Sequence, residues 1–115
     1  MEVGSPTWFT EGIAEMLTFE LTGRRSGYSG AKGLIGLDRR VNSVVDMPEY
    51  VRQSSLGADF LIEVYKLLGR DAASAFARDV AHHNVTGPDI LNAIRRQTPA
   101  DARDGLEALI KARFV

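Results

Sequence analysis

Two carboxylates one helical turn apart are the residues of this sequence best suited to chemistry. Glu11 and Glu15 lie in the segment PTWFTEGIAE at positions 6–15, and residues four apart share one face of a helix. Carboxylates placed in this way can bind a metal ion or transfer protons. The simpler interpretation of the same spacing is a solvated acidic face opposite an apolar one.

Histidines give a weaker indication of a metal site. His82 and His83 are adjacent, and neighbouring residues on a helix point about 100° apart, whereas ligands on one face need a spacing of three or four. The chain contains no His-Glu-x-x-His sequence and no cysteine, which excludes disulfides and thiolate metal sites. We interpret the two histidines as structural residues near a helix C-terminus, where the helix dipole favours them.

A helix over residues 6–22 is predicted to position the two carboxylates. Ser5 is expected to cap this helix, and Pro6 suits its first turn because its φ angle is already helical. Apolar residues recur every three or four positions, which places them on the side opposite Glu11 and Glu15. These apolar residues are Phe9, Ile13, Met16, Leu17 and Leu21.

Two glycines and one glutamate give further predictions about this helix. Gly12 costs about 1 kcal/mol relative to alanine inside a helix, so its presence predicts the close approach of another backbone. Gly23 is expected to end the helix as its C-terminal cap. Glu20 falls inside the apolar arc and needs a cationic partner; Arg24 and Arg25 are the nearest cations in the sequence.

The segment 23–47 lacks helical periodicity and holds five of the eleven glycines together with several arginines. We predict a long, mobile surface loop, in which residues 41–45 could form a short strand. The glycine spacing does not match a phosphate-binding motif. Phosphate binding by the basic residues of this loop is therefore a minor alternative to a solvated charge run.

Helical patterns return over residues 48–115. A helix is predicted over 49–68 with Gly69 as its end, a second helix is expected to be capped by Asp71, and two further helices are expected to begin at Thr86 and Thr98. The predicted buried side of the second is Ala73, Phe76, Ala77 and Val80. With the helix at 6–22, these patterns predict one all-α domain of about five helices, divided into residues 1–22, the loop 23–47 and a helical lobe over 48–115.

Composition excludes several classes of protein. The chain has 115 residues, of which 44% are hydrophobic, and a net charge of -1. This charge balance argues against a nucleic-acid or membrane-surface binder, and no apolar run reaches the roughly 18 residues of a spanning helix or resembles a signal peptide. We expect a soluble protein without a nucleic-acid or membrane partner, and the compartment stays undetermined.

The segment 6–15 resembles the Pro-x-Trp-[Leu/Phe]-x-Glu-Gly-x-Ala-Glu sequence of gluzincin-type zinc metallopeptidases, the peptidase MA superfamily. The downstream helices are similar in style to the helical C-terminal lobe of the same enzymes. The resemblance implies that Glu11 is the third zinc ligand and that Glu15 lies near the metal or the substrate. It also implies a tyrosine that steadies the oxyanion, for which Tyr50 is the nearest candidate.

The missing His-Glu-x-x-His helix limits what this resemblance implies. In the family that helix supplies two zinc ligands and the general base, so a zinc-binding, peptide-hydrolysing parent would need it upstream of Glu11. We therefore expect this chain to be a fragment or a truncated reading frame, without zinc and inactive alone, whose partner is the missing N-terminal half. The alternative is a non-catalytic helical interaction or oligomerisation module, in which self-association covers Trp8, Phe9 and Ile13.

Overall fold

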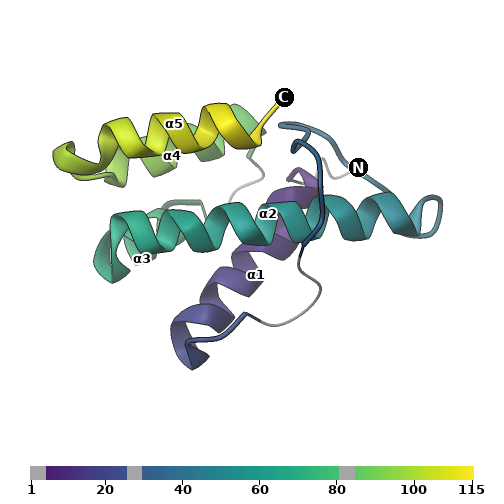
Figure 1. Ribbon diagram of the computed structural model, residues 1–115, viewed down its shortest axis with the longest axis horizontal. Coiled ribbons are helices and arrows are strands. Elements are labelled where there is room, and N and C mark those ends of the chain that lie inside the picture. The colour runs from purple at the N-terminus through teal and green to yellow at the C-terminus, as the bar shows by residue number, and fades with distance from the viewer. Residues whose placement is uncertain (1–4, 26–29, 81–84) are drawn as a thin grey trace.

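The computed structural model describes residues 5–25, 30–80 and 85–115, and these residues form an all-α fold, as the sequence predicts (Figure 1). The only β-type pairing among them is an isolated parallel bridge between Ile35 and Phe114. In chain order the elements are α1 (Thr7–Thr22), α2 (Met47–Leu68), α3 (Arg70–Val80), α4 (Gly87–Gln97), the 3-10 turn η1 (Ala100–Ala102) and α5 (Arg103–Arg113).

The longest helix, α2, runs through the middle of the molecule (Figure 1). Helix α1 crosses it obliquely, while α4 and α5 extend along the other side of α2. Helix α3 follows α2 after a sharp reversal at Gly69, whose φ angle is 88°. None of the helices in the described ranges is both long and apolar enough to cross a membrane.

The crossing of α1 and α2 is made at two glycines. A Cβ atom on Gly12 would lie 2.9 Å from the backbone carbon and oxygen of Gly57, and one on Gly57 would overlap the carbonyl oxygen of Trp8. The two backbones therefore touch with no side chain between them. This contact confirms the prediction that Gly12 permits the close approach of another backbone.

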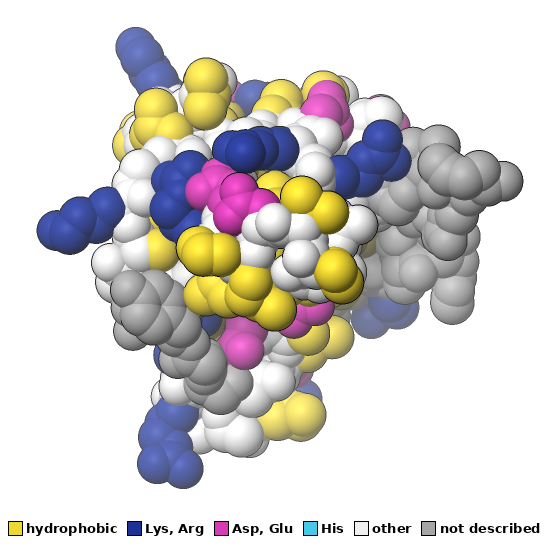
Figure 2. Space-filling model, turned by 90° about the vertical axis from the view of Figure 1, so that its right-hand side faces the viewer, with side chains coloured by type: hydrophobic (Ala, Val, Ile, Leu, Met, Phe, Trp, Pro, Cys, Tyr) yellow, Lys and Arg dark blue, Asp and Glu magenta, His cyan; other side chains and the backbone are white. Residues whose placement is uncertain are grey.

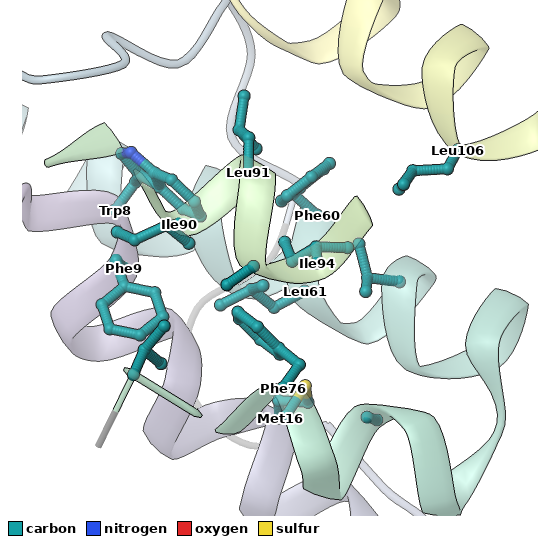
Figure 3. Close-up of a cluster of buried hydrophobic side chains, with 14 of the residues drawn as sticks. Trp8, Phe9, Met16, Phe60, Leu61, Phe76, Ile90, Leu91, Ile94 and Leu106 are labelled. Carbon is teal, nitrogen blue, oxygen red and sulfur yellow. The ribbon is translucent and has the colours of Figure 1, made fainter. Parts of the chain in front are cut away.

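The core forms around this crossing. Trp8 is fully buried and makes edge-to-face contacts with Phe60 and Phe114, at ring-centroid distances of 5.7 and 5.0 Å. Such contacts add to the stabilisation from apolar burial. Figure 3 shows side chains from α1, α2, α3 and α4 meeting here, among them Phe76 and Ile90. The chain thus covers Trp8 itself, and Phe9 is only 7% exposed, so neither residue needs an outside partner.

The described part of the glycine-rich segment forms no helix and is mostly exposed, and Ile35 and Leu37 attach it to the helices. Ile35 is fully buried, and its backbone N–H donates to the Arg113 carbonyl at 2.8 Å. The indole Nε1 of Trp8 donates to the Leu37 carbonyl at 2.9 Å. Residues 41–45 form no strand, and 43–45 make a turn; residues 26–29 lie outside the described ranges.

Two helix starts differ from the sequence prediction. The N-cap of α1 is Pro6, with no capping hydrogen bond from a side chain, so Ser5 does not cap this helix. Asp71 lies within the first turn of α3 rather than before it.

The predicted end of α1 is confirmed, but the predicted partner of Glu20 is not. Gly23 caps the end of α1, with a φ angle of 72°, and its N–H donates to the Phe19 carbonyl. The partner of Glu20 is neither Arg24 nor Arg25 but Arg70, whose Nε lies 3.0 Å away.

Side-chain caps begin α2 and α4 but not α5. Thr86 and Asp89 form the predicted reciprocal capping box of α4. Asp46, which no sequence pattern indicated as a cap, caps α2 by accepting from the Glu49 N–H at 3.2 Å. Thr98 ends α4 instead of starting α5, because its hydroxyl donates back to the Ile94 carbonyl at 2.6 Å. The 3-10 turn over 100–102 then precedes α5.

A charged network joins the glycine-rich segment to α2. Glu49 accepts two hydrogen bonds from Arg52, at 2.7 and 2.8 Å, and is also bonded by Arg39 and Gln53. Gln53 is buried and accepts from the Gly36 N–H at 3.1 Å. The hydrogen bonds from Arg52 lower the pKa of Glu49 below its ordinary value, against an opposing effect of desolvation.

Glu49→Gln should reduce stability at neutral pH by about 1 kcal/mol, because the arginines lose a charged acceptor. Since the folded pKa of Glu49 lies below its unfolded value, its stabilisation is complete above the unfolded pKa and is lost as pH falls through the folded pKa. The stability difference between the two proteins should therefore shrink below about pH 5. Urea denaturation between pH 7 and pH 3 measures it, and two parallel stability curves would contradict the prediction.

Gly57→Ala tests the helix crossing. Alanine normally stabilises a helix by about 1 kcal/mol relative to glycine, but a methyl group here would overlap the Trp8 backbone. We expect a net loss of about 3 kcal/mol in the free energy of unfolding. Gly105→Ala in α5 is the control, because its methyl group would meet only the movable Leu67 side chain, at 3.3 Å; this variant should match or slightly exceed the wild type.

Candidate functional site

An open cavity of about 200 Å³ lies between α1 and α2. It brings together the three site residues proposed from the sequence, Glu11, Glu15 and Tyr50. The remaining lining residues are Arg25, Val51, Ser54, Ser55 and Ala58. Residues separated by up to 47 positions in the chain thus line one cavity, and we take it as the candidate site.

The glycine crossing determines which side chains meet in this cavity. Glu11 precedes Gly12, which lies against α2, and Glu15 follows one turn later on the same face of α1. Tyr50 is in the first turn of α2, and its hydroxyl donates to Oε2 of Glu11 at 3.2 Å. The Tyr50 side chain therefore spans the gap between the two helices.

The phenol of Tyr50 keeps its proton over a wide pH range. Partial burial raises the pKa of Tyr50 above its ordinary value, and the charge and hydrogen bond of Glu11 raise it further. A smaller opposing effect comes from the Ser54 hydroxyl. At neutral pH Tyr50 is therefore a neutral hydrogen-bond donor beside an exposed carboxylate.

Arg25, which the sequence pattern suggested as a partner of Glu20, lies in the candidate site instead. Its side chain is only 18% exposed, and its guanidinium pairs with Asp59 at 3.0 Å and with Glu15 at 4.0 Å. It also donates to the backbone oxygen and the hydroxyl of Ser55, at 3.3 and 3.1 Å. Ser55 and Asp59 are four residues apart on α2. This spacing is the one sequence pattern which indicates that the two acceptors lie on the same helix face.

The described residues do not by themselves make a zinc site. Within residues 5–25, 30–80 and 85–115, no group of three histidine, cysteine, aspartate or glutamate side chains is arranged to hold a metal ion. A catalytic zinc needs three protein ligands, and Glu11 can supply one of them. His82 and His83 lie outside the described ranges.

Two arginines of the glycine-rich segment are held in ion pairs with carboxylates of α2. Arg39 pairs with Glu49, and Arg25 pairs with Asp59. Arg52 of α2 donates to the Lys32 backbone oxygen at 2.9 Å. Because part of this positive charge is already balanced by carboxylates, the geometry favours structural ion pairs over anion binding.

The described residues also form two exposed apolar surfaces. A groove of about 560 Å³ lies between α1 and α3 and includes Phe9, Ile13 and Leu17, of which Leu17 is 43% exposed. Figure 2 faces the end of the molecule where α2 begins, and hydrophobic side chains are exposed there beside charged ones. The exposed apolar residues before and within the start of α2 are Val44, Val45, Met47 and Val51.

Comparison of the chain with models of protein families, with curated proteins and with solved structures finds no significant match.

Proposed function

We propose that this chain is the C-terminal helical half of a zinc metallopeptidase-like domain, in which Glu11 is one zinc ligand. The observation that carries the proposal is the convergence of Glu11, Glu15 and Tyr50 on one open cavity. These residues were selected from the sequence resemblance, and Tyr50 lies 39 positions from Glu11. An exposed carboxylate beside a neutral donor is a suitable environment for a metal ligand.

The zinc ligands and the general base would be divided between the two halves of the domain. The N-terminal half would supply the His-Glu-x-x-His helix, with two ligands and the general base. This half contributes the Glu11 carboxylate, a second carboxylate held near the Arg25 guanidinium, and the walls of the cavity. With one ligand and no general base of that type, this half alone is inactive.

The test compares this chain with a longer polypeptide that includes the segment encoded upstream of Met1. With added Zn²⁺, the present chain should not hydrolyse a peptide substrate, and the longer polypeptide should. Glu11→Gln in the longer polypeptide should lower kcat/KM by at least about 100-fold, because a ligand is lost from a three-ligand site.

Glu63→Gln is the control for that experiment. Glu63 pairs with Arg113 at 2.6 Å and does not line the cavity, so its removal should leave peptidase activity near the wild-type level. An upstream segment without His-Glu-x-x-His, or activity that persists in Glu11→Gln, would contradict the proposal.

A second candidate function is a non-catalytic interaction or oligomerisation module, favoured by the groove between α1 and α3. The groove is apolar along Phe9, Ile13 and Leu17, and apolar surfaces of this kind often mark contacts between proteins. Since Trp8 and Phe9 are buried within the chain, Leu17 is the better residue to test.

Under this second function the chain should self-associate, and Leu17→Glu should shift it toward the monomer. Leu34→Glu is the matched control, because Leu34 is 48% exposed but lies outside the groove. Light scattering over a concentration series measures the mass of each protein. A wild-type chain that stays monomeric at every concentration would argue against self-association.

A further inference from the structure

We propose that the groove between α1 and α3 binds an amphiphilic carboxylate of the fatty-acid type, with its apolar chain along α1 and its carboxylate on Arg78 of α3. The groove has a volume of about 560 Å³, which is within the range of pockets that bind small ligands. Among the described residues, none lines both this groove and the cavity at Glu11. The inference therefore goes beyond the proposed function and does not depend on zinc binding.

The apolar part of the groove suits a hydrocarbon chain. Phe9, Ile13 and Leu17 follow one another at a spacing of four, so they form a continuous stripe along α1. The ring of Phe9 also meets that of Phe76 on α3 edge to face, with the centroids 6.2 Å apart. Phe9 and Val80 are almost buried, whereas Leu17 is 43% exposed. A hydrocarbon chain in the groove would cover Leu17 and remove its apolar surface from water.

The α3 side of the groove carries a guanidinium and a hydroxyl one helical turn apart. Ser74 and Arg78 both line the groove, and their spacing of four places them on one face of the helix. Asp79, the acid next to Arg78 in the sequence, pairs instead with Arg96 at 2.8 Å. Within the described residues, the side chains of Ser74 and Arg78 have no hydrogen-bond or ion-pair partner. Together they can donate several hydrogen bonds to one carboxylate.

The charge of the groove distinguishes an anion from other occupants. Arg78 is the only charged side chain among the described lining residues. An uncharged apolar ligand would leave its guanidinium without a partner. A symmetric contact of this groove with that of a second copy would bring two Arg78 side chains to one interface, with no carboxylate from either groove. A carboxylate on an apolar chain therefore matches both parts of the groove.

Titration of the chain with dodecanoate tests the inference. Calorimetry near neutral pH, below the concentration at which the ligand forms micelles, should show one saturable site. Arg78→Gln should weaken binding by at least about 10-fold, because a charge-assisted hydrogen bond is lost. Arg78 is exposed, so this variant should stay folded, which circular dichroism checks.

Arg103→Gln is the matched control for the charge. Arg103 of α5 is also exposed and, among the described residues, has no carboxylate partner, but it does not line the groove. This variant should bind dodecanoate like the wild type. The cationic amphiphile dodecyltrimethylammonium has an apolar chain of the same length, and it should bind the wild type at least about 10-fold more weakly than dodecanoate.

Leu17→Ser tests the apolar part and should also weaken dodecanoate binding. Leu34→Ser should not, because Leu34 is 48% exposed but lies outside the groove. Changes in the amide NMR spectrum on adding dodecanoate should centre on residues 9–17 of α1 and 74–80 of α3.

Three results would each overturn the inference. The first is no saturable binding of dodecanoate, which would favour a protein or a second copy as the occupant. The second is equal affinity of the wild type and Arg78→Gln, or equal binding of the cationic amphiphile. The third is a set of NMR changes centred on the cavity at Glu11. Because neither zinc nor a peptide substrate is present, these results are separate from the outcome of the peptidase test.

Discussion

The contact between the backbones of α1 and α2 at Gly12 and Gly57 is the constraint on which the rest of the structure depends. It brings Trp8 deep enough for its ring to pack on Phe60 and for its indole N–H to reach the glycine-rich segment. That segment is in turn joined to the C-terminal residues through Ile35. One close crossing thus links the N-terminal helix, the central helix and the chain end.

The same crossing forms the candidate site. Glu11 lies next to the contact on α1, and Tyr50 lies two turns before Gly57 on α2, so the distance between their side chains follows from the helix separation. Stability and site geometry therefore have a common origin. Arg25 reinforces this arrangement by pairing with Glu15 on one helix and Asp59 on the other.

The helices could be predicted because their signals are local. Apolar periodicity, the glycine stops at Gly23 and Gly69 and the Thr86–Asp89 capping box each depend on residues a few positions apart. Two expectations from local patterns were wrong. Thr98 precedes a proline, as at a helix start, yet its hydroxyl donates to the Ile94 carbonyl four residues earlier, at the end of α4. Glu20 pairs with Arg70, which is 50 positions away and which local spacing does not indicate. The packing of residues 30–46 also depends on distant partners, which periodicity does not reveal.

For the candidate site, too, the sequence indicates only the local part of the geometry. The spacing of Glu11 and Glu15 places them on one face of α1, but the contact between Glu11 and Tyr50 depends on how α1 crosses α2.

The most direct test of Glu11 as a zinc ligand is X-ray diffraction at the zinc absorption edge, from crystals of the longer polypeptide grown with Zn²⁺. If Glu11 is a zinc ligand, an anomalous peak should lie about 2.0–2.2 Å from one of its carboxylate oxygens. A zinc peak bound without Glu11 would contradict it.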